Sequence, residues 1–133
     1  MSALRADHVR IPAGSQALDG DLTIPEHARG LVIFAHGSGS SRHSPRNRAV
    51  AAHLQQAGFA TLLIDLLTPD EERADAVATA YRFDIPRLSD RLTRIVEWAV
   101  RWPDLSGLPI GLFGASTGAA AALDAAARLP GTV

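Results

Sequence analysis

A serine with a glycine two positions away on each side joins an apolar run to an alanine-rich run. The segment Gly114-Ala115-Ser116-Thr117-Gly118 follows the apolar residues 108–113 and precedes residues 119–129, which are mostly good helix formers. This order predicts a strand, a tight turn and a helix. A serine held in so sharp a turn leaves no room for side chains two positions away, and glycine meets that need. The chain is thereby constrained to a fold in which a strand delivers Ser116 to the start of a helix.

Apolar runs elsewhere in the chain predict further strands. Residues 31–35 and 59–65 are almost entirely apolar, which is typical of strands buried on both faces of a parallel sheet. Residues 8–12 and 18–25 are partly polar, and turn-forming residues at 13–16 separate them. These two segments predict an antiparallel hairpin at an edge of the sheet.

Helical patterns separate the predicted strands. One helix is predicted to begin with Ser44 as N-cap and Pro45 in its first turn, and to end at Gly58. A longer amphipathic helix is predicted from Pro86 to a point before Pro103, with Trp98 and Trp102 as packing residues. Its other faces are expected to carry the charged side chains Arg87, Asp90, Arg91, Arg94 and Glu97.

Strands that alternate with helices over 133 residues predict one three-layer α/β/α domain. We expect a mostly parallel sheet with an antiparallel N-terminal hairpin. The charged residues 68–80 predict either a short helix or a flap beside the site. Functional groups in such sheets gather at the carboxyl ends of the strands. Residues 36–41, Asp65 and Ser116 each follow a predicted strand, so we expect them to converge on one edge of the sheet.

Composition excludes several classes of function. The formal net charge is −1 and charges of both signs are interspersed, so no nucleic-acid partner is expected. The absence of cysteine excludes disulfides, thiolate metal sites and a cysteine nucleophile. No apolar stretch reaches the length of a membrane span, and the N-terminus has no signal-peptide pattern. We therefore expect a cytoplasmic protein without membrane contact.

Two local patterns have alternative interpretations. Gly37-Ser38-Gly39-Ser40 follows a predicted strand and could cradle a phosphate, but the Gly-Lys-Ser/Thr ending of a phosphate loop is absent, as is any lysine. The run Asp70-Glu71-Glu72 could hold a metal, but an acidic run of this kind is more often a solvated turn. We expect neither a phosphate loop nor a metal site.

The predicted hairpin, the loop His36-Gly37-Ser38-Gly39 and the serine turn at 114–118 together resemble the α/β-hydrolase fold, specifically its dienelactone-hydrolase-like members. The more discriminating motif is residues 36–47, in which this loop leads into a distinctive helix start. The resemblance covers the chain but only about the N-terminal half of a complete hydrolase. It implies that residues 1–133 form a single, C-terminally incomplete domain that ends after the helix following Ser116.

The resemblance also implies a mechanism. Ser116 would attack an ester or related acyl carbonyl, and the acyl-enzyme would then be hydrolysed without a metal or organic cofactor. The oxyanion would be held by the backbone N–H of Thr117 and by that of Ser38 or Gly39. Supporting roles would fall to the turn residues Gly114 and Gly118 and to the loop residues His36 and Gly37.

Two departures from the family pattern affect this expectation. Dienelactone hydrolases proper have cysteine where this chain has Ser116, so the substrate of that enzyme does not carry over. The family places its catalytic acid and histidine after the nucleophile, whereas residues 117–133 include Asp124 but no histidine. A serine without a base is a poor nucleophile, so we expect weak or no activity from this stretch alone.

Polar residues near the predicted loop have open roles. His36 or His43 could act as the base, or could shape the loop through hydrogen bonds, for instance with Asp65. The nearby arginines could bind a substrate carboxylate or phosphate, or form salt bridges; they are Arg42, Arg46 and Arg48. Arg42, His43 and Asp65 are therefore predicted to contact either substrate or loop.

An alternative function is a non-catalytic half-domain that binds a ligand or a partner chain. In the complete fold, the strand that ends at the serine pairs with a further strand on its far side. The strand from Pro109 to Phe113 would then be an open apolar edge in this chain. We expect it to self-associate or to receive the missing C-terminal half.

Overall fold

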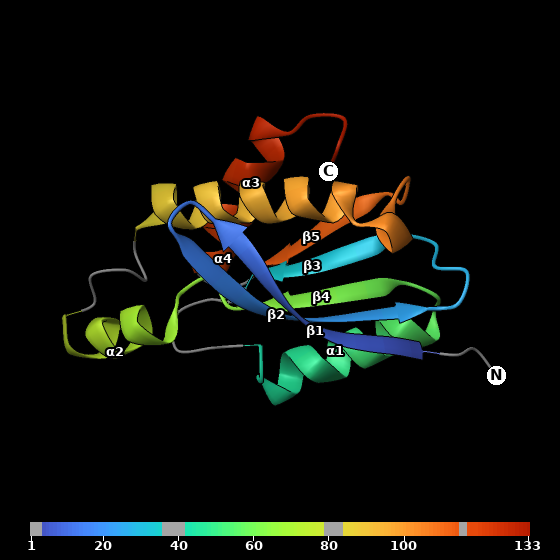
Figure 1. Ribbon diagram of the computed structural model, residues 1–133, viewed down its shortest axis with the longest axis horizontal. Coiled ribbons are helices and arrows are strands. Elements are labelled where there is room, and N and C mark those ends of the chain that lie inside the picture. Colours follow the sequence, from blue (N-terminus) through green and yellow to red (C-terminus); the bar gives the residue numbers. More distant parts are fainter. Residues whose placement is uncertain (1–3, 36–41, 79–83, 115–116) are drawn as a thin grey trace.

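The computed structural model describes residues 4–35, 42–78, 84–114 and 117–133, and these form a five-stranded sheet with helices (Figure 1). The strands are β1 (Leu4–Ala13), β2 (Gln16–Pro25), β3 (Leu31–Ala35), β4 (Ala60–Ile64) and β5 (Ile110–Gly114). Their order in the sheet is β1-β2-β4-β3-β5. The strands β4, β3 and β5 are parallel to one another. The strands β1 and β2 form an antiparallel hairpin, and β2 also pairs with β4 in the antiparallel direction.

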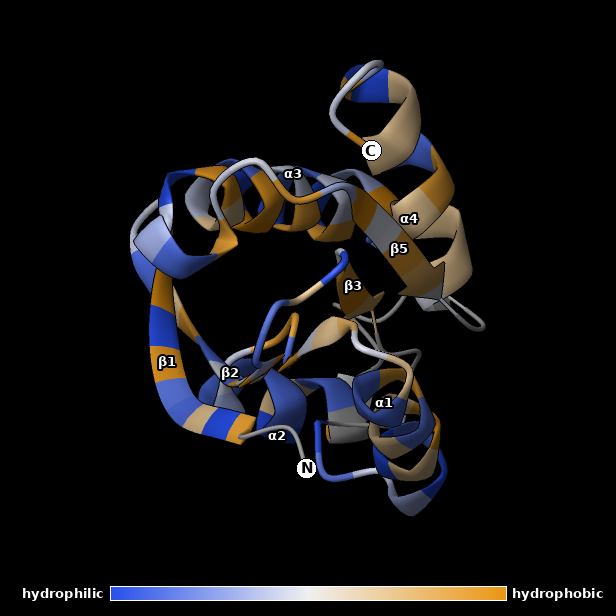
Figure 2. Ribbon diagram, turned by 90° about the vertical axis from the view of Figure 1, so that its right-hand side faces the viewer, coloured by the Kyte–Doolittle hydropathy of each residue, from blue (hydrophilic) through white to orange (hydrophobic). Residues whose placement is uncertain are grey.

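Helices cover both faces of this sheet. They are α1 (Pro45–Gln56), α2 (Pro69–Ala78), α3 (Ile85–Arg101) and α4 (Thr117–Arg128), with the 3-10 turn η1 (Pro103–Leu105). The helices α3 and α4 pack on one face, and α1 packs on the other. In Figure 2, α3 and α1 stand on opposite sides of β3, and β3 and β5 carry hydrophobic colours. The predicted three-layer fold with an antiparallel hairpin is confirmed.

The buried strands contribute alternate side chains to two apolar clusters. On β3, Leu31, Ile33 and Ala35 join the larger cluster beneath α3 and α4. Val32 and Phe34 point the other way and pack against α1. This division follows from the alternation of side chains along a strand, and it explains why these strands are apolar throughout.

The N-terminal hairpin is longer than predicted. Its strands reach Leu4 and Pro25 at their open end, and they are joined at Gly14 and Ser15. Gly14 has a φ of +67°. Two-residue hairpin turns have a positive φ at their first position, and glycine adopts it without steric strain. The extra residues of β1 are largely exposed, so they have no hydrophobic pattern, and backbone pairing alone extends the strand.

Local capping signals define α1. The Ser44 side chain accepts a hydrogen bond from the N–H of Asn47 at 3.4 Å. At the other end, the N–H of Phe59 donates to the Leu54 carbonyl at 2.9 Å, and that of Gly58 to Gln55 at 3.0 Å. Gly58 has a φ of +93°, which completes a Schellman motif. The predicted ends of this helix are confirmed.

The acidic run is the first turn of a helix, not a solvated turn. Thr68 and Glu71 form a capping box: the Thr68 hydroxyl accepts from the N–H of Glu71 at 3.2 Å, and the Glu71 carboxylate accepts from the N–H of Thr68 at 2.9 Å. The negative charges of acidic residues in a first turn also interact favourably with the positive end of the helix dipole. Of the two interpretations of residues 68–80, the short helix is confirmed by α2.

Arg91 was expected on a face of α3 away from the apolar residues, and the structure buries this side chain against Glu71. The two Arg91 Nη atoms donate to the two Glu71 carboxylate oxygens at 2.6 and 2.7 Å, and one of them also donates to the Leu66 carbonyl at 2.8 Å. Both side chains are about nine-tenths covered. The paired carboxylate neutralises the guanidinium, which makes burial of the charge possible.

The same contacts determine the acidity of Glu71. Burial alone would raise the pKa of its carboxyl, but the hydrogen bonds from Arg91 and from Thr68 outweigh burial and lower that pKa. Glu71 therefore stays ionised and holds the chain after β4 against α3.

Candidate active site

The three parallel strands end at the same level. Ala35, the last residue of β3, is the register partner of Ile64 on β4 and of Gly114 on β5. The chain that follows each strand therefore leaves the sheet at one edge. Asp65 follows β4 there. This arrangement is the one required for the predicted convergence of residues 36–41, Asp65 and Ser116, although residues 36–41 and 115–116 lie outside the described part of the chain.

The passage from β5 to α4 brings two backbone segments into close contact. A Cβ atom placed on Gly114 would lie 2.6 Å from the carbonyl oxygen of Gly118 and 2.8 Å from the Cα of Ala119. Real Cβ atoms do not approach backbone so closely, so residue 114 has to be glycine. This is the steric condition that the sequence predicted for a sharp turn around Ser116.

The start of α4 supplies backbone donors at the same edge. Thr117 is its first residue, and Gly118 is buried in its first turn. The first N–H groups of a helix have no acceptor within the helix, and the helix dipole gives them partial positive charge. They are suited to hold an anion, including the oxyanion of an acyl-transfer reaction.

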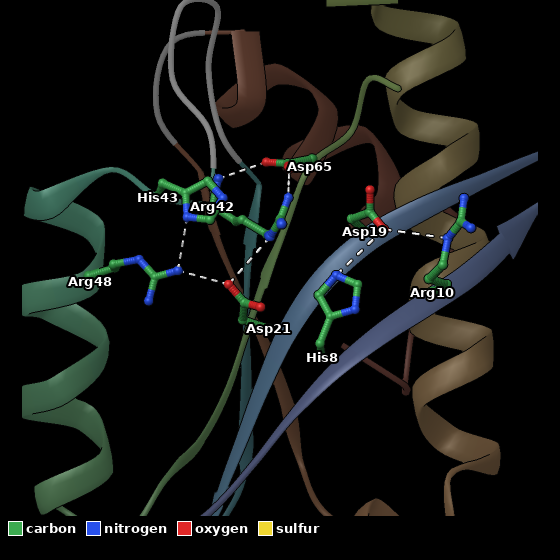
Figure 3. A network of polar contacts seen from close by, with 8 residues as sticks. All are labelled: His8, Arg10, Asp19, Asp21, Arg42, His43, Arg48 and Asp65. Carbon is green, nitrogen blue, oxygen red and sulfur yellow. Dashed lines mark hydrogen bonds and ion pairs between the residues drawn. The ribbon is translucent and has the colours of Figure 1, made fainter. Parts of the chain in front are cut away.

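A network of ion pairs lies beside this edge (Figure 3). One carboxylate oxygen of Asp65 accepts from the backbone N–H of Arg42 at 2.7 Å, and the other accepts from the Arg42 guanidinium. The Arg42 Nε lies 3.4 Å from an oxygen of Asp21 on β2. Asp65 is anchored in turn, because its N–H donates to the Asp19 carbonyl at 2.9 Å.

The network continues toward α1. Arg48 Nη2 lies 2.8 Å from the Asp21 carboxylate and 3.3 Å from Nδ1 of His43 (Figure 3). On the hairpin, a carboxylate oxygen of Asp19 lies 3.5 Å from Nε2 of His8 and 3.4 Å from Nε of Arg10. Arg42 and Arg48 are therefore both engaged in salt bridges, which is one of the two roles predicted for them.

Comparison with solved structures places this geometry in a known fold. A dienelactone hydrolase from Anabaena variabilis superimposes with a TM-score of 0.94 and 54% sequence identity, over 98% of this chain and 60% of that one. The chain has the α/β-hydrolase fold of dienelactone-hydrolase-like proteins. Est1E from Butyrivibrio proteoclasticus shares this hydrolase fold, with a TM-score of 0.77 and 20% identity over 95% of this chain and 47% of that one.

Sequence comparison finds curated relatives of this chain in two strains of Mycobacterium tuberculosis, CDC 1551 and H37Rv. Each is described as a "putative phosphoribosyl transferase" and is 57% identical over 124 residues. The match covers 93% of this chain but 27% of each relative. No family model matches the sequence. The chain thus spans about a quarter of the length of its curated relatives.

The structure describes six of the predicted site residues, and the others lie outside its described part. Gly114, Thr117 and Gly118 lie at the junction of β5 with α4, and Asp65, Arg42 and His43 lie in or beside the ion-pair network. Outside the described part are Ser116, His36, Gly37, Ser38 and Gly39. The roles assigned to these residues stay predictions.

Two features of the network were not predicted. We considered a histidine as the partner of Asp65, but in the described residues Asp65 binds Arg42, whose forked guanidinium reaches two carboxylates at once. Asp21 was missed because its place depends on the antiparallel pairing of β2 with β4, where it lies opposite Leu63. The available signal was the period-two spacing of Asp19 and Asp21, which puts both on one face of the hairpin.

Neither a metal cluster nor a membrane span occurs in the described residues of this chain. No group of three or more histidine, aspartate or glutamate side chains is placed there to hold a metal ion. Over the same residues, no helix is both long and apolar enough to cross a bilayer.

Substitution of Gly114 by alanine is expected to lower the free energy of unfolding by about 1–3 kcal/mol, because the new methyl group would force β5 away from α4. Gly111→Ala is the matched control on the same strand, since a Cβ at Gly111 meets nothing within 4 Å. Urea unfolding of both variants measures the difference. Equal stability of the two variants would contradict the close backbone contact at Gly114.

Proposed function

We propose that the protein is a serine hydrolase of esters or related acyl compounds, with Ser116 as its nucleophile. The observation that carries this proposal is the contact of Gly114 with the Gly118 backbone, at the edge where β3, β4 and β5 end. That contact is what a strained turn around an exposed serine requires. The similarity to a dienelactone hydrolase over 98% of the chain supports it.

In the proposed reaction, the Ser116 hydroxyl oxygen forms a bond to the acyl carbon as a base takes its proton. The carbonyl oxygen becomes an oxyanion, held by the N–H of Thr117 and by that of Ser38 or Gly39. Collapse breaks the bond to the leaving alcohol, which receives the proton. Water then attacks the acyl-enzyme by the same steps and releases the acid.

The base has to come from outside the stretch that follows the serine in this sequence. Residues 117–133 contain no histidine. We propose that the acid and the histidine are supplied by other polypeptide, and that residues 1–133 alone hydrolyse esters weakly or not at all.

The name of the mycobacterial relatives is compatible with this proposal. The chain matches 27% of each of them, which leaves most of each relative to carry a phosphoribosyl transferase activity. This chain has no lysine and no Gly-Lys-Ser/Thr sequence, so its glycine-rich loop is not of the P-loop type. We therefore propose acyl hydrolysis for residues 1–133 and assign phosphoribosyl transfer to none of them.

A fluorophosphonate probe tests the proposed function, because it reacts covalently with activated serines. The protein, purified as its cell makes it, is expected to gain the mass of one probe group, on the peptide that contains Ser116. Denatured protein is the control and should stay unlabelled. Absence of labelling under conditions in which an authentic serine hydrolase reacts would overturn the proposal.

A second candidate function is association through β5. In the described residues, this strand lies at the edge of the sheet. Its residue Phe113 is 39% exposed, although the centroid of its ring lies 5.0 Å from that of Phe34. An open edge with an exposed aromatic side chain invites another strand. We propose that a further strand of protein chain pairs with β5.

Hydrogen exchange tests this pairing in the protein as the cell makes it. The β5 amides that point away from β3 are expected to exchange slowly if another strand covers them. The outer amides of β1, at the opposite edge of the sheet, serve as the internal reference for a free edge. Exchange at β5 as fast as at β1 would contradict the proposed association.

A further inference from the structure

We infer that Asp65 is a positioning residue for the oxyanion-binding loop: through Arg42 it fixes the point at which the chain from β3 arrives at α1. This inference rests on the proposed function, because it concerns the same site. It assigns to Asp65 no contact with substrate and no proton transfer.

Asp65 itself is held firmly. It follows directly after the buried strand β4, its N–H donates to the Asp19 carbonyl at 2.9 Å, and its side chain is 15% exposed. Two strands therefore fix the main chain from which its carboxylate projects. A carboxylate fixed in this way can act as an anchor for another segment.

The carboxylate holds Arg42 at two points. One oxygen accepts from the backbone N–H at 2.7 Å, and the other accepts from the guanidinium (Figure 3). The backbone contact fixes the main chain of residue 42, and the guanidinium contact makes the interaction charge-assisted. A role limited to charge balance would not need the backbone contact.

The charge of Arg42 is already balanced. Its Nε lies 3.4 Å from Asp21, its Nη1 binds Asp65, and its side chain is 18% exposed. Both of these acids belong to the protein's own strands and their continuations, so the arginine is assigned to the framework of the site.

The placement of these anchors gives them a role in catalysis. In sequence, the proposed oxyanion donors Ser38 and Gly39 fall between Ala35, which is fixed in the ladder between β4 and β5, and Arg42. Oxyanion donors act because they are oriented in advance. A shift of about 1 Å in such a group can reduce the rate by about 100-fold.

Two variants of Asp65 test the inference in the protein as the cell makes it. Asp65→Ala removes both acceptors, and it is expected to lower kcat for a neutral acyl ester by about 10- to 100-fold. Asp65→Asn keeps one acceptor for the Arg42 N–H but loses the charge, and it is expected to lower kcat by about 3- to 10-fold. KM should change little in both, because the loss lies in the transition state.

Asp19→Asn is the matched control. Asp19 is a neighbouring carboxylate whose ion-pair partners are His8 and Arg10, and its contact with Asp65 is through its backbone carbonyl. Its substitution should leave kcat unchanged. The fluorophosphonate labelling rate, corrected for the folded fraction, should follow the same order as kcat.

The outcomes separate this inference from the proposed function. An unlabelled wild-type protein would mean that the proposed function itself fails. If the wild-type protein is labelled and both Asp65 variants match its kcat per folded molecule, then the positioning role is overturned, even where their melting temperature falls. The asparagine variant keeps the test decisive if the alanine variant does not fold.

Discussion

Replacement of Ser116 by alanine is expected to lower kcat for ester hydrolysis by about 10⁴- to 10⁶-fold and to abolish labelling by the fluorophosphonate. The reason is that the proposed acyl-enzyme forms on this hydroxyl, so alanine leaves only binding and oxyanion stabilisation. The measurement is steady-state hydrolysis of a neutral acyl ester by the protein as its cell makes it.

Ser106→Ala is the matched control for this experiment. Ser106 is an exposed serine just after η1, on the chain that leads to β5, and it belongs to no part of the proposed site. This variant should retain wild-type kcat and labelling. A Ser116→Ala protein that still hydrolysed the ester at the wild-type rate would place the nucleophile elsewhere.

Replacement of Arg91 by alanine is expected to lower the free energy of unfolding by about 3–5 kcal/mol, because Glu71 loses its hydrogen-bonded cation and keeps only the half-exposed Arg87 at 3.8 Å. The Leu66 carbonyl would lose a hydrogen bond as well. Arg94→Ala, one turn away, is the control: Arg94 pairs with Asp90 at 3.2 Å in an exposed position, so about 0–1 kcal/mol is expected. Urea unfolding at pH 7 compares the two.

A double variant separates the cost of the unpaired charge from the value of the pair. Glu71→Leu with Arg91→Met removes both charges, and it should recover much of the stability lost in Arg91→Ala. Equal losses in the Arg91 and Arg94 single variants would show that the buried contact of Arg91 with Glu71 contributes no more than a surface ion pair.

Acid should weaken the same contact. The pKa of Glu71 is lowered below its ordinary value of 4.5 in the folded state, so the unfolded chain binds a proton more readily as the pH falls. The stabilisation is complete above that ordinary value and is lost as the pH drops through the folded-state pKa. The stability difference between wild type and Glu71→Gln should therefore shrink below about pH 4.5. A stability difference that does not change with pH would contradict the lowered pKa of Glu71.

Local signals in the sequence predicted most of the fold. The apolar runs of β3 and β4 and the caps of α1 depend on neighbouring residues, so they can be interpreted without knowledge of the tertiary structure. The burial of Arg91 could not be predicted in this way, because its partner Glu71 lies on another helix, 20 residues away. The capping box at Thr68 and Glu71 was a local signal for α2 that the acidic composition of the run obscured.

The candidate site shows the same division. The glycine at position 114 follows from local sterics, and the structure supplies the backbone that excludes a side chain there. The ion-pair network needed the pairing of β2 with β4, which no pattern within either strand specifies. Period-two spacing indicated that Asp19 and Asp21 share a face, but the strand next to them became known only from the sheet order.

The strand order has a consequence for where a ligand can bind. The chain leaving β3 goes to α1 on one face of the sheet, and the chain leaving β5 goes to α4 on the opposite face, although β3 and β5 are neighbours. This pair of strands is therefore the topological switch point of the sheet, which is where open α/β sheets bind ligands. That location is a property of the backbone topology. Side chains near it can change and alter what is bound while the ladder of β3, β4 and β5 stays the same.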